Sequence, residues 1–212
     1  MIEQDTIKPS GKPLGKPSGK PLGKTAEAIA GTFLGLVMER GYNAVSYADL
    51  ARLLGIRTAS IHYHFPSKSD LGLAVLRRYA QGFFDTVAPP DPADAHSYEQ
   101  AFDALLTPIR AVSQTKGASC LMGVLGAEYQ SLSPALQAEV NAFFTRQQAF
   151  LETLLEEGRT AGAFSFSGSA AAMARLMASA LQGAILIKKA RQDPAHVDSV
   201  ITSLRAMVMA EN

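Results

Sequence analysis

The chain has 212 residues, is 47% hydrophobic, and carries a formal net charge of +1. That length suits one large domain or a small domain joined to a larger one, and the near-zero net charge gives no overall sign of a nucleic-acid partner. The single cysteine, Cys120, excludes an internal disulfide and fits a reducing compartment. No run approaches 18 apolar residues and the first residues hold no apolar core, so we expect no transmembrane helix, secretory signal or membrane partner. These features predict a cytoplasmic protein.

Residues 1–24 differ from the rest of the chain in charge and composition. They contain five lysines against Glu3 and Asp5, a net charge of +3, whereas residues 71–212 contain 11 basic and 13 acidic residues, a net charge of −2. The repeat "GKPLGKPSGKPLGK" places its lysines four residues apart, at Lys12, Lys16, Lys20 and Lys24. Its prolines and glycines predict a disordered or extended arm, and its charge indicates a polyanionic partner. The alternatives are a solubilising tail or a start codon placed too early.

Four helices are predicted after this arm, at residues 25–40, 47–55, 57–65 and 68 to about 87. Apolar residues recur at helical spacing in the first of them, at Ile29, Phe33, Leu36 and Val37. Gly41 follows where a helix stop residue is expected. Two capping boxes, Ser46-x-x-Asp49 and Ser67-x-x-Asp70, open the second and fourth helices.

The rest of the chain is helical in pattern beyond the break "PPDPADA" at residues 89–95. We place helices near 97–115, 120–130, 134–160, 169–191 and 195–210. Ser133-Pro134 and Asp193-Pro194 each set a cap before a proline at the first helical position. The segment "AFSFSG" (163–168) alternates only briefly, and its glycine and serine neighbours predict a loop. The fold class is therefore all-α, with a small N-terminal helical unit and a C-terminal helical bundle.

The second and third helices, joined by a tight turn that contains Gly55, have the outline of a helix-turn-helix. At about 100° per residue, Ile61 and Phe65 point inward. Ala59, Ser60, His62 and Tyr63 then lie on the opposite side, with Thr58 and His64 flanking them. This small, polar and aromatic face suits a major groove, and the alternative is the solvated face of a structural helix. His62 and His64 stand about 200° apart, so they cannot chelate one metal ion.

The stretch "SYADLARLLGIRTASIHYHFPSKSDLGLAVL", Ser46 to Leu76, resembles the DNA-binding domain of the TetR family of transcriptional repressors. The resemblance covers roughly residues 25–87. It implies a helix-turn-helix domain over 25–70, a connecting helix over 71–88, and an effector-binding and dimerisation domain over 89–212. It also implies a homodimer that binds a palindromic double-stranded operator and is released by a small-molecule effector.

The resemblance assigns roles by position. Bases would be read by Arg57, Thr58, Ala59 and Ser60, and base methyls or phosphates would be contacted by His62, Tyr63 and His64. Lys68 and Ser46 would contact phosphate, and residues just before the first helix would reach the minor groove, which gives the arm lysines a target. The family usually has tyrosine where this chain has His62. Histidine still donates to phosphate, more strongly when protonated.

The C-terminal half offers two kinds of effector site. Apolar helix positions permit an adaptable pocket, and we take as its candidate lining Phe102, Leu106, Met122, Phe143, Phe144, Met173 and Met177. The segment "ASCLMGVLGAEYQSLSP" (118–134) is similar to one in TetR-type repressors that respond to electrophiles or oxidants. There Cys120 would be the sensing thiol, with Lys189 as the cooperating lysine, and a nearby cation or helix start would favour the thiolate. The alternatives are a non-covalent ligand, or a cysteine that only packs.

Other functions are weighed against a repressor. A thiol enzyme that uses Cys120 with His96 or His196 lacks an orienting third residue and an oxyanion site. A constitutive or architectural DNA-binding protein does not need the long apolar C-terminal bundle. The small residues of "SAAAMARLMASALQGAILI" allow close helix approach, and the resemblance to the TetR family implies that the last two helices form a four-helix dimer interface. We expect no catalytic activity, no cofactor and no metal.

Overall fold

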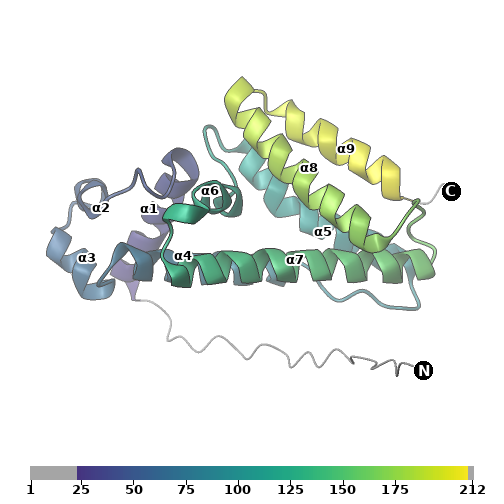
Figure 1. The fold of residues 1–212 in the computed structure, drawn as a ribbon, viewed down its shortest axis with the longest axis horizontal. Helices are drawn as coiled ribbons and strands as arrows, with labels where there is room; N and C mark the ends of the chain where they lie inside the picture. The colour runs from purple at the N-terminus through teal and green to yellow at the C-terminus, as the bar shows by residue number, and fades with distance from the viewer. Residues whose placement is uncertain (1–22, 210–212) are drawn as a thin grey trace, which may run out of the picture.

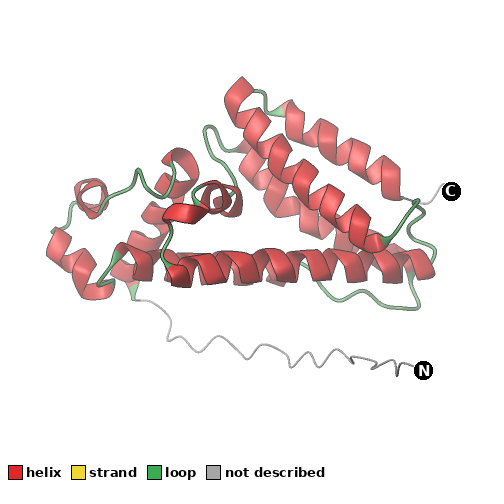
Figure 2. Ribbon diagram, in the orientation of Figure 1, coloured by secondary structure: helices red, strands yellow, loops and turns green. Residues whose placement is uncertain are grey.

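The computed structural model describes residues 23–209, and this part of the chain is helical throughout apart from its loops (Figures 1 and 2). The all-α prediction is confirmed. In chain order the elements are α1 (Lys24–Arg40), α2 (Tyr47–Leu54), α3 (Thr58–His64), α4 (Lys68–Asp85), α5 (Ala95–Gln114), α6 (Leu121–Ala127), the 3-10 helix η1 (Tyr129–Ser131), α7 (Pro134–Thr160), α8 (Ala170–Arg191) and α9 (Ala195–Val208).

The first three helices form a small unit at one end of the molecule (Figure 1). The apolar face predicted for α1 is buried, and Phe33 packs edge-on against the ring of Tyr42. Leu50 from α2 and Ile61 from α3 are fully buried against it. This packing stabilises two helices of only eight and seven residues, which are too short to be stable alone.

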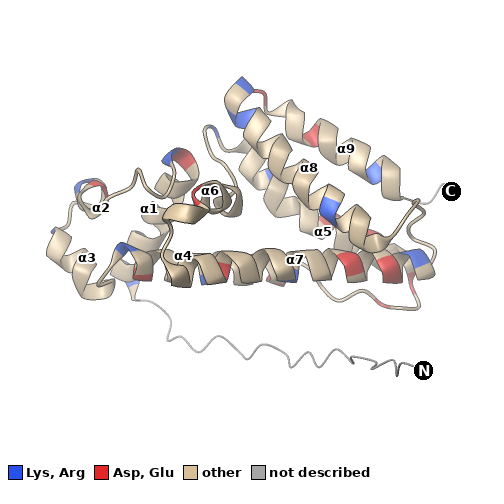
Figure 3. Cartoon of the chain, in the orientation of Figure 1, with Lys and Arg blue, Asp and Glu red and all other residues tan. Residues whose placement is uncertain are grey.

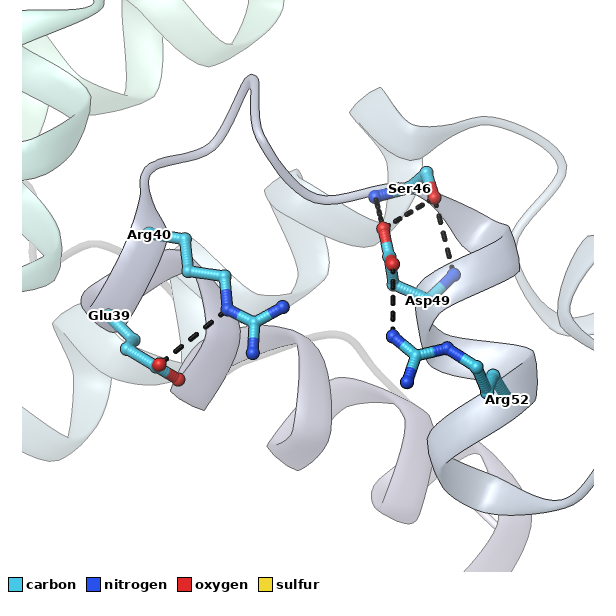
Figure 4. Close-up of polar contacts among 5 residues, drawn as sticks. All are labelled: Glu39, Arg40, Ser46, Asp49 and Arg52. Carbon is cyan, nitrogen blue, oxygen red and sulfur yellow. Dashed lines mark hydrogen bonds and ion pairs between the residues drawn. The ribbon is translucent and has the colours of Figure 1, made fainter.

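The predicted helix ends are built from local hydrogen bonds. Both predicted capping boxes are present, and Figure 4 shows the first, in which the Ser46 side chain accepts from the Asp49 nitrogen while the Asp49 carboxylate accepts from the Ser46 nitrogen. Ser67 and Asp70 repeat this exchange at the start of α4. Gly55 ends α2 at φ +64°, the left-handed region that lets the chain turn sharply into α3.

The second part of the molecule is a helical bundle. α4 leaves the N-terminal unit and packs beside α7, while α8 packs against both α7 and α9 (Figure 1). The short helix α6 lies between the N-terminal unit and the bundle, and it contacts α1 and α7. One continuous core joins both parts, so a displacement of bundle helices reaches the N-terminal unit through packed side chains.

Two sequence predictions need correction. The helix predicted over 120–130 is split at Glu128, whose backbone (φ −99°, ψ 13°) leaves the helical region, because glycines at 123 and 126 weaken this segment as a helix. The proline at the start of the last helix, Pro194, is its N-cap rather than its first residue. Among the described residues, α8 alone meets a length-and-composition test for a membrane span, a test that the core helix of a soluble protein also meets.

Candidate nucleic-acid interface and effector site

The outward side of α3 is the candidate nucleic-acid interface. Ile61 and Phe65 are buried, as the helical angles predict. The opposite side is open to solvent, and Tyr63 is 84% exposed. We call this side the recognition face, and its exposed residues are Arg57, Thr58, Ala59, His62, Tyr63 and His64. Ser60 is half-buried beside it.

Two aromatic contacts order the recognition face. Tyr63 and His64 pack edge-on, with ring centroids 5.1 Å apart. His62 packs against Tyr47 of α2, with centroids 4.8 Å apart, and its Nδ1 lies 3.1 Å from the carbonyl oxygen of Pro66. Tyr47 donates its hydroxyl to the carbonyl of Phe65 at 2.9 Å. The sequence analysis did not identify Tyr47 as a partner of His62, although it stands at the first position of the capped helix α2.

Lys68 and Ser46, the predicted phosphate contacts beside α3, already have partners inside the protein. The Lys68 Nζ donates to the carbonyls of Tyr42 and Val45 at 3.1 Å each and lies 4.5 Å above the Tyr42 ring. Burial lowers the pKa of this lysine. The Ser46 hydroxyl donates to Asp49 at 2.6 Å. Lys68 therefore holds the α1–α2 loop against α4, a role that its sequence position did not indicate.

Basic residues are sparse around the recognition face. Figure 3 shows no gathering of Lys and Arg on α2 or α3, whereas blue segments lie close together at the end of α8. Arg52 of α2 is paired with Asp49 at 3.4 Å, and Arg40 with Glu39 at 3.6 Å (Figure 4). Lys24 is exposed at the start of α1, whereas the other arm lysines lie outside the described residues, namely Lys8, Lys12, Lys16 and Lys20.

An apolar cavity lies between α4, α5, α7 and α8. We call it the inner cavity, and its volume is about 20 Å³, room for roughly one water molecule. Three of the predicted effector residues line it, namely Phe102, Leu106 and Met177. The sequence analysis missed two amides in its wall, Gln147 and Gln182. Gln147 is only 7% exposed, borders the cavity, and makes no hydrogen bond within residues 23–209.

The remaining apolar candidates belong to the core. Phe143 packs against the rings of Phe83, Phe84 and Phe144, and Met122 and Met173 are buried elsewhere in the same core. A signal for the missed amide was present in the sequence. Gln147 stands four residues after Phe143 and four before Leu151, so a polar residue occupies the apolar face of α7.

A second and larger hollow contains the two residues predicted to act as a sensor. This thiol cleft has a volume of about 410 Å³, and its lining includes Arg40, Gly41, Cys120, Glu128, Gln182 and Lys189. That volume is in the range of small-molecule sites. Gln182 lines both spaces, so it separates the thiol cleft from the inner cavity.

Cys120 is 4% exposed and stands at the N-cap of α6, as expected from the sequence. Its sulfur lies 3.5 Å from the hydroxyl of Tyr79 and 3.4 Å from Nε2 of Gln182. Burial, together with the nearby thiol, raises the pKa of Tyr79, so this hydroxyl stays protonated. Neither Lys189 nor a histidine contacts Cys120 in the described part of the chain.

Two adjacent lysines of α8 bind the ends of two other helices. Lys189 donates to the carbonyl of Glu39 at 2.8 Å, near the end of α1. Lys188 is buried and donates to the carbonyls of Val112 and Thr115 at 3.2 and 2.7 Å, where α5 ends. Burial, with Lys189 next to it, lowers the pKa of Lys188. The sequence analysis singled out only Lys189.

Comparison with known proteins agrees with this geometry. Residues 34–75 match the family model of bacterial regulatory proteins of the tetR family, and residues 100–204 match that of the tetracyclin repressor-like C-terminal domain. The transcriptional regulator AcuR of Cereibacter sphaeroides is 27% identical over 173 residues, 74% of each chain.

Solved structures extend the likeness over most of the molecule. A TetR-family transcriptional regulator from Agrobacterium tumefaciens is 30% identical with a TM-score of 0.77, over 87% of this chain and 97% of that one. A TetR transcriptional regulator from Legionella pneumophila is 26% identical with a TM-score of 0.71, over 89% and 100%. With both halves matched by family models and the whole fold shared with these regulators, the chain belongs to the TetR family of transcriptional regulators.

Proposed function

We propose that the chain is a dimeric repressor whose recognition face binds a palindromic operator and whose effector site controls that binding. The observation that carries this proposal is the recognition face itself. A capped two-helix unit presents exposed polar and aromatic side chains at one end of the molecule, where a DNA groove has free access to them. A regulator of transcription acts where the DNA is, so we place the protein in the cytoplasm.

An apolar face on α8 and α9 supports the dimer. Leu186 is 66% exposed, and Leu176, Ile187 and Met207 are each more than 40% exposed. Only 39% of the most apolar 18-residue window of α8 is buried within one chain. Exposed apolar area of this kind marks an interface, and a second copy of the same helices would cover it.

The effector site has a direct physical connection to the recognition face. Phe83 of α4 lines the inner cavity, and Lys68 at the other end of α4 holds the α1–α2 loop. In the thiol cleft, the Ser119 nitrogen donates to the carbonyl of Met38 at 2.8 Å. A ligand that enlarges either space would therefore displace α4 or α6, and with them the helices that hold α3.

The linings favour particular effector chemistries. The inner cavity contains no charged residue, so once its helices move apart to enlarge it, it would accept a small neutral molecule that is mainly apolar and bonds to Gln147 through a polar group. A covalent effector would instead react with Cys120 and occupy the thiol cleft. These two routes share the wall residue Gln182, because its amide contacts the thiol and borders both spaces.

The geometry gives less support to the other functions. His96 lies 3.3 Å from Glu99 on α5, and the near neighbours of the thiol are a tyrosine and a glutamine, so no thiol–histidine pair supports an enzyme. A cavity lined by Phe102, Leu106 and Gln147 also has no use in a purely architectural protein.

Selection of bound duplexes from a random-sequence pool tests the proposed function. The protein should enrich a palindromic sequence, and Arg57→Ala should lower affinity for it while Lys116→Ala does not. Lys116 is an exposed cation in the turn after α5, outside the helix-turn-helix unit, so it is a matched control. Equal losses in both variants, or no enriched sequence, would show that α3 is not the DNA-reading element.

Treatment of the protein–DNA complex with N-ethylmaleimide or a mild oxidant separates the two effector routes. A sensing thiol predicts that the wild type releases DNA and that Cys120→Ser does not. Equal release from both proteins would exclude Cys120 as the sensor and favour a reversible ligand in the inner cavity.

A further inference from the structure

The ring of His62 is fixed in one tautomer by its surroundings. Its Nδ1 lies 3.1 Å from the carbonyl oxygen of Pro66. A carbonyl oxygen only accepts hydrogen bonds, so Nδ1 must carry a hydrogen and donate it. In the neutral ring the other nitrogen, Nε2, then has a lone pair and no hydrogen. Only the protonated ring has a hydrogen on Nε2 as well.

The position of the ring is also fixed. Tyr47 packs against it at an interplanar angle of 63°, and Tyr47 is itself anchored by its bond to the carbonyl of Phe65. Pro66 holds the Nδ1 edge. His62 is otherwise exposed, so Nε2 is the ring nitrogen available to a partner outside the protein. A ring flip would offer Nδ1 instead, but it would turn a carbon toward the Pro66 carbonyl and lose the hydrogen bond.

We propose that His62 contacts a DNA phosphate through Nε2 only when the imidazole is protonated, so that operator affinity falls as pH rises. The inference rests on the proposed DNA-binding function. A neutral His62 would turn its Nε2 lone pair toward the phosphate oxygens, which are also acceptors, and the contact would become repulsive. A protonated His62 instead forms a charge-assisted hydrogen bond, which is stronger than a neutral one.

The ionisable groups around His62 would not themselves make DNA binding depend on pH in this range. Burial, with Asp70 and Tyr42 nearby, raises the pKa of Tyr47 to about 12, so Tyr47 stays neutral near physiological pH. From α4, Asp70 is bonded to Ser67, and Lys68 donates to the carbonyls of the α1–α2 loop.

The other charged groups of α2 and α3 leave His62 without an internal partner. Asp49 and Arg52 of α2 pair with each other, and on α3 Arg57 has a fixed charge while His64 packs against Tyr63. None of the ion pairs between described residues includes His62. The phosphate would therefore be the anion that stabilises its protonated form.

The sign of the effect follows from proton linkage. The DNA-bound protein holds one more proton per subunit than the free protein once free His62 is neutral, so higher pH favours release. Imidazoles change charge between about pH 5 and 8, and a charge-assisted bond changes affinity by about tenfold or more. A dimer with two such contacts should then lose roughly a hundredfold in affinity from pH 6 to pH 8.

The test uses the full-length protein and a duplex that it selects from a random pool at pH 6, with fluorescence anisotropy at constant ionic strength. His62→Tyr replaces the imidazole with a hydroxyl that donates at both pH values, so we expect a flat pH profile and tighter binding than wild type at pH 8. His96→Gln removes an exposed histidine of α5 and should keep the profile of the wild type. Calorimetry in two buffers of different ionisation enthalpy should show proton uptake for the wild type and less for His62→Tyr.

Different contrary results would refute different parts of the proposal. A His62→Tyr protein with the full pH dependence, or His64→Gln with a flat profile, would overturn the assignment to His62. Affinity that rises with pH would show that neutral Nε2 accepts from a base amino group instead. Selection of no duplex at any pH would refute the DNA-binding function, whereas tight binding without pH dependence would refute only this inference.

Discussion

Glu128, at the end of α6, accepts a 2.8 Å hydrogen bond from the backbone nitrogen of Asn43, in the loop that leads from α1 into α2. The side-chain amide of Asn43 also donates a hydrogen bond to the hydroxyl of Ser131, at 2.7 Å. A Cβ added at Gly41 would overlap the other carboxylate oxygen of Glu128. The carboxylate therefore fits against this loop because residue 41 has no side chain. Through it, the segment after Cys120 is bonded directly to the helix-turn-helix unit.

Gly41→Ala should destabilise the protein and weaken the connection between the segment after Cys120 and the helix-turn-helix unit. The φ of +102° is strained for alanine, and the added methyl group would displace Glu128 from Asn43. We expect a loss of about 2–3 kcal/mol in the free energy of unfolding, measured with urea. Gly35→Ala is the matched control, since it lies within α1 with open space around it and should be neutral or stabilising by up to about 1 kcal/mol. A neutral Gly41→Ala would mean that Glu128 is not held tightly here.

Gln147→Leu should stabilise the protein while reducing its response to a reversible effector. No hydrogen bond within the described residues involves Gln147, and its amide atoms keep slight solvent access, so leucine at this largely buried position should add apolar burial worth about 1 kcal/mol or less. Thermal unfolding measures the gain, and effector-induced DNA release measures the loss. Leu151→Met, on the same face of α7, is the control that should keep both properties near those of the wild type. A destabilised Gln147→Leu would show that the amide has a partner, such as a bound water.

The local sequence was sufficient to predict the recognition unit. Ser46 and Asp49, three residues apart, specify a capping box, and the angular separation of Ile61 from His62 specifies which side of α3 is buried. These features depend on neighbours within one or two turns. The predicted domain division and the DNA contacts stay predictions, because no bound DNA fixes which side chains reach it.

The candidate effector site was predicted only in part, because its geometry depends on contacts between distant segments. Cys120 and Lys189 do line one cleft, but Lys189 bonds to Glu39, which is 150 residues away in the sequence. Helical periodicity cannot distinguish Phe102, which borders the inner cavity, from Phe143, which packs into the core. Both are apolar positions on buried faces, and only the tertiary packing separates them, because Phe102 borders the space between α4, α5, α7 and α8 whereas Phe143 packs against Phe83 and Phe84 of α4.

Leu186→Glu should prevent dimer formation. Leu186 is 66% exposed on α8, and a carboxylate there would be buried without a partner against a second copy of the helix. Sedimentation analysis should show monomers for this variant and dimers for the wild type, and affinity for a palindromic duplex should fall accordingly. Leu53→Glu changes an equally apolar exposed residue on α2 and should remain dimeric. If Leu186→Glu is also a dimer, the interface lies elsewhere.

Lys188→Met should change how stability depends on pH in the alkaline range. Burial lowers the pKa of Lys188 in the folded protein, so the unfolded chain binds its proton more tightly. At pH values between the pKa of Lys188 in the folded protein and its ordinary pKa of 10.5, rising pH therefore favours the folded wild type. Urea unfolding from pH 7 to pH 10 should show the wild type gaining stability relative to Lys188→Met. Parallel curves for the two proteins would indicate that Lys188 keeps an ordinary affinity for its proton.

Deletion of residues 1–23 should lower the salt dependence of operator binding. This segment contains the arm lysines Lys12, Lys16 and Lys20. It is net positive, whereas residues 71–212 are net negative. If those three lysines neutralise phosphates, the slope of log K against log salt should decrease by roughly 3 per arm, at about 0.9 per contact. The matched control replaces the same three lysines with glutamine in the full-length chain, which keeps length and proline content. An unchanged slope in both proteins would show that the arm does not contact DNA. A decrease in the deletion alone would assign the effect to the remaining arm residues instead of these lysines.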